Sequence, residues 1–188
     1  MPTLFGLALD RETFRRSGRE AGLKLTAAAC LSASGGRRPP RRSAVEDLYL
    51  RLSGPGKVQA TLGGALVHAD GDWILWGRAG GEMRRQGAPD LELRPGERGV
   101  FDGRFEVEAV EAARISALAG RMSQLSPKVR AGLADVPPMF RGGLPLAESA
   151  SGLDLPPGRS GGVRFRPLAG ARLAAACGAM PRESTVRD

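Results

Sequence analysis

The spacing of apolar residues predicts several helices along the chain. Between residues 10 and 30, apolar and small residues recur at intervals of three and four, which predicts a helix capped by Asp10. Ser43 and Glu46 match the pattern of a capping box and predict a better helix that ends before residues 53–56. Ser126-Pro127 predicts a further helix start, and an Ala-rich helix is expected over residues 169–177.

From Lys57 onward apolar residues recur at about every second position, which predicts antiparallel strands. Two runs, 59–68 and 73–78, are expected to pair across a turn, and a third short strand covers 91–94. Asp102-Gly103 between apolar residues is a strong signal for a two-residue hairpin turn, because both turn positions favour positive φ. The alternation that follows it predicts a half-buried strand, and residues 162–167 are the clearest later strand.

Together these elements predict an α+β fold, with N-terminal helices followed by a small antiparallel β-rich domain that carries a few short helices. Residues 1–42 are expected to be a poorly ordered or loosely helical basic segment, which ends in a linker rich in Ser, Gly, Pro and Arg. Residues 43–180 are expected to form the α+β domain, and residues 181–188 a frayed tail.

Composition narrows the possible functions. Hydrophobic residues make up 41% and charged residues 26% of the 188 residues, and no apolar run approaches the roughly 20 residues that cross a bilayer. The aromatic share of 5% argues against a protein that stacks on single-stranded bases. The net charge is +8, which attracts polyanions and is compatible with RNA binding. A GC-rich genome is an alternative explanation of the many arginines.

The residue types of common catalytic and metal sites are scarce. Cys30 and Cys177 lie far apart, and His68 is the single histidine, so neither a metal site of the usual ligands nor a metal is expected. The two separate thiols fit a reducing cytoplasm. The carboxylates show no spacing that singles out a catalytic pair. The chain therefore has the character of a binding module, with no catalytic residue assigned.

One glycine-rich stretch, Ser34-Gly35-Gly36, resembles the start of a phosphate-binding loop. A nucleotide-binding loop that begins Ser-Gly-Gly continues with any residue, then Asp and Ser, and leads into a helix. Here the continuation is Arg37-Arg38-Pro39-Pro40. Arginine and proline replace the carboxylate and the hydroxyl, so we do not expect this stretch to bind ATP.

Several basic residues are candidate contacts for RNA phosphates. Arg84 and Arg85 lie beside an expected loop, and Arg104 follows the tight turn. Lys128 and Arg130 lie in the first turn of the helix that begins at Ser126-Pro127, where free backbone amides favour an anion. The alternative for each is an ordinary solvated side chain.

Between about residues 45 and 180, an ordered series of short motifs resembles the C-terminal portion of bacterial tRNA(Ile)-lysidine synthetases, especially of the alphaproteobacterial type. Each motif is weak alone, and their order carries the resemblance. The motifs are Ala60-Thr61-Leu62-Gly63-Gly64, Leu75-Trp76-Gly77-Arg78, Leu93-Arg94-Pro95-Gly96-Glu97, Phe101-Asp102-Gly103-Arg104-Phe105, the helix start at 125–133, Gly142-Gly143-Leu144-Pro145 and Leu173-Ala174-Ala175-Ala176-Cys177-Gly178.

The resemblance implies a cytoplasmic ligase of tRNA processing that modifies tRNA. The family uses ATP and Mg to adenylate the wobble cytidine of isoleucine tRNA, and lysine then displaces AMP to give lysidine. An N-terminal domain performs this chemistry, and the C-terminal portion binds and selects the tRNA. This chain departs from that pattern because it lacks the catalytic domain. We therefore expect an RNA-binding fragment or split product that is catalytically incompetent alone and holds no cofactor. Its expected partners are tRNA and a separate catalytic domain, and no association with a membrane is expected.

Two other interpretations stay open. The chain could be a basic α+β protein-interaction module with no catalytic role, which predicts no preference for any tRNA. It could also be a small enzyme that uses the carboxylates near Asp102.

Overall fold

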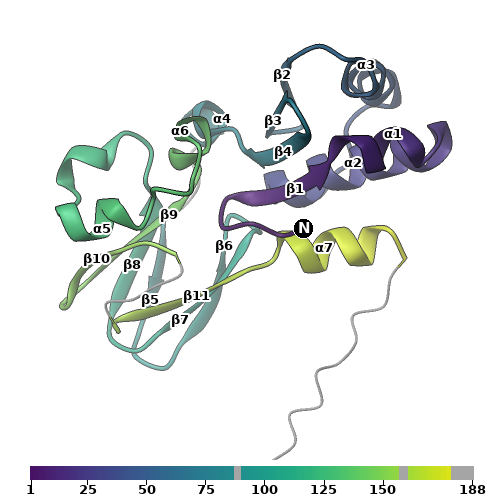
Figure 1. Ribbon diagram of the computed structural model, residues 1–188. Coiled ribbons are helices and arrows are strands. Elements are labelled where there is room, and N and C mark those ends of the chain that lie inside the picture. Colours follow the sequence, from purple (N-terminus) through teal and green to yellow (C-terminus); the bar gives the residue numbers. More distant parts are fainter. Residues whose placement is uncertain (87–89, 157–160, 179–188) are drawn as a thin grey trace, which may run out of the picture.

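The computed structural model describes residues 1–86, 90–156 and 161–178, apart from the side chains of Arg84 and Gln86. Two lobes, each with its own apolar core, lie side by side (Figure 1). The N-terminal lobe consists of one four-stranded antiparallel sheet, in the order β1-β4-β3-β2, and four helices. Its elements are β1 (Gly6–Asp10), α1 (Arg11–Arg16), α2 (Arg19–Ser34), α3 (Arg42–Ser53), β2 (Val58–Leu62), β3 (Ala65–Asp70), β4 (Trp73–Arg78) and α7 (Ala169–Ala176).

The C-terminal lobe contains two antiparallel sheets, in the orders β10-β9-β8-β5 and β11-β7-β6, and short helical turns. Helix α4 (Gly80–Gln86) connects the two lobes. The remaining elements are β5 (Leu91–Leu93), β6 (Arg98–Phe101), β7 (Phe105–Ala109), β8 (Ala113–Ala117), the 3-10 helix η1 (Arg121–Gln124), α5 (Pro127–Ala131), α6 (Pro138–Arg141), β9 (Pro145–Ser149), β10 (Gly152–Asp154) and β11 (Val163–Pro167).

The core of the N-terminal lobe lies between its sheet and helices α2 and α3. Ala65, Val67 and Ala69 alternate along β3 as buried residues, as a strand with one covered face requires. Leu48 and Leu52 of α3 and Cys30 of α2 belong to the same cluster. The run predicted over 59–68 is itself a hairpin, because Gly63 and Gly64 adopt positive φ and turn β2 into β3.

The structure places a strand and two helices in residues 1–42, the segment that the sequence predicts to be poorly ordered or loosely helical. Phe14, Ala29 and Ala33 of this segment are buried in the N-terminal core. The Asp10 carboxylate accepts a hydrogen bond from the Thr13 amide at 2.7 Å and caps α1 as predicted. The predicted helix is divided in two at Gly18, whose φ is 75°. The proposed domain boundary at residue 42 stays a prediction, and residues 181–188 lie outside the described part of the chain.

The hairpin turn at Asp102-Gly103 is confirmed. β6 pairs with β7 in antiparallel register with Phe101 opposite Phe105, and Asp102 and Gly103 have φ values of 49° and 64°, the positive φ that the sequence predicts at both turn positions. Phe105, Val107 and Ala109 alternate as buried residues along β7. The capping box at Ser43 is wrong: the N-cap of α3 is Arg41, two residues earlier, and it makes no side-chain capping bond.

The two ends of the described chain each reach across to the other lobe. Near the N-terminus, Phe5 stacks on Phe140 of α6, with ring centroids 4.7 Å apart and planes 7° from parallel. From the C-terminal side, α7 packs against α2 and β1 of the N-terminal lobe, as Figure 1 shows. The architecture is the predicted mix of helices and antiparallel sheets, so the α+β fold class is confirmed.

We expect the Phe140→Ala variant to be destabilised by about 3–5 kcal/mol, because it leaves a cavity under Phe5 in the C-terminal core. Phe140 is 1% exposed. Urea titration followed by circular dichroism measures the change. Met139→Ala is the matched control, since Met139 is 38% exposed, and it is expected to shift stability by no more than about 0.5 kcal/mol. Equal effects of the two variants would contradict the interlobe stacking.

Candidate nucleic-acid interface

The proposed phosphate contacts lie on different elements. Arg85 is exposed on α4 and forms an ion pair with Glu82 one turn earlier. It borders a hollow of about 390 Å³ between α4 and α6 that Met139 and Gly142 also line. Arg84 lies on the same helix, but its side chain is outside the described part. Arg85 therefore faces solvent with its charge shared by a neighbouring carboxylate.

Lys128 and Arg130 lie on α5, which begins as the sequence predicts. The Ser126 hydroxyl accepts a hydrogen bond from the Val129 amide at 3.3 Å, and Pro127 takes the first helical position. Arg130 is exposed but donates to the carbonyl oxygens of Met122 and Leu125, at 3.2 and 3.1 Å. Lys128 is exposed. Among the proposed contacts whose side chains the structure describes, these two share one element.

Arg104 lies in the interior and not on the surface, which corrects the expectation from its place beside a turn. Its side chain is 3% exposed. Its Nε donates to the Asp102 carboxylate at 2.8 Å, and its Nη2 donates to the Gly143 carbonyl oxygen. Burial lowers the pKa of the Arg104 guanidinium to about 10, while Asp102 counteracts that shift. Arg104 thus stays charged at neutral pH, but RNA cannot reach it.

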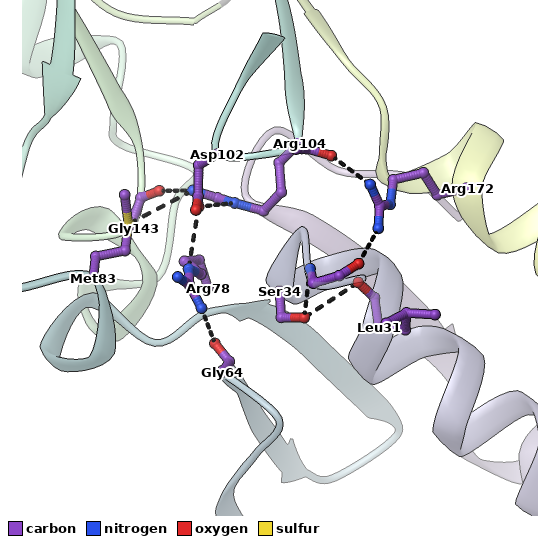
Figure 2. Close-up of polar contacts among 11 residues, drawn as sticks. Leu31, Ser34, Gly64, Arg78, Met83, Asp102, Arg104, Gly143 and Arg172 are labelled. Atoms are coloured by element: carbon purple, nitrogen blue, oxygen red, sulfur yellow. Dashed lines mark hydrogen bonds and ion pairs between the residues drawn. The ribbon is translucent and has the colours of Figure 1, made fainter. Parts of the chain in front are cut away.

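Asp102 and Arg104 belong to a buried ionic cluster at the junction of the lobes (Figure 2). Arg78, at the end of β4, donates from Nε to the same Asp102 oxygen at 3.1 Å and from Nη1 to the Gly64 carbonyl oxygen at 3.2 Å. The cluster therefore joins the last strand of the N-terminal sheet to the β6–β7 turn of the C-terminal lobe. The Asp102 carboxylate, on which a catalytic role near this residue would depend, is therefore engaged by two guanidinium groups.

The Ser34-Gly35-Gly36 stretch ends α2 and packs against that same turn. Gly35 is the C-cap with a φ of 70°, and a Cβ there would overlap the Asp102 carbonyl oxygen. Arg172 of α7 donates to the Gly36 carbonyl oxygen and, at 2.9 Å, to that of Gly103, as Figure 2 shows. The hairpin turn thus packs against Gly35, and the place of the two glycines in the fold is a helix end followed by a loop.

A second Ser-Gly-Gly sequence spans residues 160–162, of which Ser160 lies outside the described part. It continues with Val163 and Arg164 of β11. It therefore leads into a strand, whereas a phosphate-binding loop of this type leads into a helix.

The two cysteines and the histidine lie on different segments of the fold. Cys30 is fully buried, and burial raises the pKa of its thiol to about 12. Cys177 is exposed, and His68 lies half-buried on β3. Among the described residues, no three His, Cys, Asp or Glu side chains lie close enough to hold a metal ion. Within the same residues, no helix has the length and apolarity needed to span a membrane.

A comparison with curated proteins identifies a relative. The chain is 40% identical over 167 residues to a tRNA(Ile)-lysidine synthase from Caulobacter vibrioides. The match covers 84% of this chain and falls on the C-terminal part of that enzyme. This chain is similar to the C-terminal part of a tRNA(Ile)-lysidine synthase. The resemblance expected from the ordered motifs is thereby confirmed.

The match spans 41% of the length of the Caulobacter protein. No protein-family model and no solved structure matches the chain. The aligned region covers most of the present sequence, so the similarity extends over both lobes.

We expect Asp102→Asn to destabilise the protein by about 3–5 kcal/mol, because it leaves two buried guanidinium groups without their counter-charge. Asparagine tolerates the positive φ of the turn, so the backbone is not strained. The free energy of unfolding from urea titration measures the loss. Asp90→Asn removes a carboxylate that pairs with the exposed Arg114 and should change stability little. A near-neutral Asp102→Asn would show that the cluster does not hold the lobes together.

The two thiols should differ sharply in reactivity. Iodoacetamide reacts with thiolates, and burial keeps Cys30 protonated and covered at pH 8. We expect mass spectrometry of the native protein to show alkylation at Cys177 alone, with Cys30 labelled only after unfolding. Rapid labelling of Cys30 under native conditions would contradict the packing of α2 against β4.

Proposed function

We propose that this chain is the tRNA-binding part of a tRNA(Ile)-lysidine synthase and is catalytically incompetent alone. The observation that carries the proposal is the 40% identity over 84% of the chain to the C-terminal part of such an enzyme. The partners in this proposal are isoleucine tRNA and a separate catalytic domain. The protein would act in the cytoplasm.

In this proposal, ATP- and Mg-dependent ligation of lysine to the wobble cytidine takes place on the catalytic domain. The chain contributes the binding and selection of the tRNA. The structure supports this division of labour, because Asp102 is committed to Arg78 and Arg104. Gly35 of the Ser34-Gly35-Gly36 stretch likewise packs against the hairpin turn.

Charge supports a nucleic-acid partner. The net charge of +8 produces a field that raises the rate of encounter with a polyanion. Arg85, Lys128 and Arg130 lie on the surface and are the phosphate contacts that we retain from the sequence, whereas Arg104 is withdrawn because it is buried. Phosphate contacts set affinity and register, but selection of one tRNA needs contacts to bases or recognition of shape.

We expect the chain to bind isoleucine tRNA with an affinity that falls steeply as salt rises, because binding to phosphates releases counterions. Fluorescence anisotropy of labelled tRNA at a series of salt concentrations between about 50 and 300 mM measures the slope. A non-cognate tRNA of equal length is the control. Weaker binding to that control would support selection by this chain.

Three outcomes separate the alternatives. Equal affinity for both tRNAs would limit the role to contact with the backbone. A shallow salt dependence with no tRNA preference would favour the protein-interaction module. Formation of lysidine from ATP, lysine and tRNA by the chain alone would overturn the proposed incompetence.

A further inference from the structure

One basic segment lies apart from Arg85, Lys128 and Arg130. Between Glu20 and Glu46 the sequence contains five basic residues and no acidic one. Four of them cluster where α2 is joined to α3, in a segment that we call the arginine loop and that ends on the first residue of α3: Arg37, Arg38, Pro39, Pro40, Arg41 and Arg42. All four arginines of the loop are exposed.

The arginine loop differs from most of the surface in its lack of counter-charge. The guanidinium groups of Arg37, Arg38 and Arg41 make no ion pair or hydrogen bond with any residue that the structure describes, while Arg42 pairs with Glu46 at 3.1 Å. Elsewhere among the described residues, many surface arginines pair with a carboxylate: Arg15, Arg16, Arg85, Arg98, Arg114, Arg121, Arg164 and Arg166. Arg19 and Arg94 also lack an ion pair among the described residues, but the arginine loop places three such arginines within five positions of the chain.

The arginine loop is fixed by packing at its start and in its middle. At its start, Gly35 fits against the Asp102 carbonyl oxygen, and Arg172 donates to the Gly36 carbonyl oxygen. In its middle, Pro40 packs against Gly63, where an added Cβ would lie 3.1 Å from the proline Cγ. Two consecutive prolines restrict φ further. A loop held in this way loses less conformational entropy on binding than a free chain.

The chemistry of the loop points to phosphate groups and not to bases. Arginine presents a planar set of donors that matches two phosphate oxygens. Base stacking requires exposed aromatic rings, and the loop contains none. Among the large hydrophobic side chains that are exposed in the described residues, the aromatic one is Trp73, which begins β4 after the acidic turn at Asp70 and Asp72. Contact with phosphates alone is independent of sequence.

We propose that the arginine loop is a phosphate-binding surface of the N-terminal lobe that grips the sugar-phosphate backbone of the bound RNA through Arg37, Arg38 and Arg41. This inference rests on the proposed function, because it takes the RNA to be tRNA. It adds a contact surface outside α4 and α5. It also assigns this surface to affinity, with selection of the tRNA left to other residues.

The test compares the triple variant R37Q/R38Q/R41Q with the intact chain in the anisotropy titration. The slope of log affinity against log salt should fall by about 3, or about 1 for each phosphate that the variant no longer binds. The affinity at low salt should fall by roughly tenfold or more, and by the same factor for the cognate and the non-cognate tRNA. R37K/R38K/R41K keeps the charge and should retain most of the affinity.

The matched control is R98Q/R164Q/R166Q, which removes the same net charge from exposed arginines of β6 and β11 that pair with Glu106 and Glu108. It should bind tRNA nearly as the intact chain does. The unfolding temperature of each variant checks that the fold is retained. If both glutamine variants lose affinity equally, net charge and not the loop is responsible, and the inference is wrong.

The two proposals fail in different ways. An intact chain that binds no tRNA overturns the proposed function and the loop with it. An intact chain that binds tRNA with the same slope as R37Q/R38Q/R41Q overturns the loop alone. Binding to vesicles of anionic phospholipid that is tighter than to tRNA, and lost in that variant, would assign the loop to a membrane surface and overturn the RNA contact.

Discussion

The arrangement of the two lobes depends on one carboxylate. Asp102 lies between the guanidinium groups of Arg78 and Arg104, whose side chains are 7% and 3% exposed. Burying two cations is costly unless a counter-charge and further acceptors are close, and the carbonyl oxygens of Gly64 and Gly143 supply those acceptors. Because these groups come from both lobes, neither lobe can satisfy the cluster without the other.

The residue at position 102 meets a second demand at the same time. The hairpin turn needs positive φ there, a conformation that aspartate tolerates better than most residues. The turn then approaches the end of α2 so closely that a Cβ on Gly103 would lie 2.5 Å from the Gly35 carbonyl oxygen. Arg172 bridges the two segments from α7. One turn therefore fixes the lobes, the end of α2 and the start of the loop that follows it.

Local features were predictable from the sequence, and long-range ones were not. The hairpin at Asp102-Gly103, the alternation along β7 and the caps at Asp10 and Ser126 depend on neighbouring residues, so their patterns were sufficient. Strand β1 could not be predicted, because it pairs with β4 more than sixty positions away. Helix α3 begins at Arg42 with Arg41 as its N-cap, so the local capping pattern at Ser43 did not determine where it begins.

The candidate site shows the same limit more sharply, because arginine serves three purposes in this chain. Arg11 is buried and donates to the carbonyl oxygens of Leu52, Gly54 and Gly56 at the end of α3. Arginines on the sheets pair with carboxylates across strands, as Arg166 does with Glu106. A sequence counts all of these equally toward the charge of +8. What distinguishes a potential phosphate contact is exposure without a neighbouring carboxylate, and that depends on which distant residues the fold brings near each guanidinium.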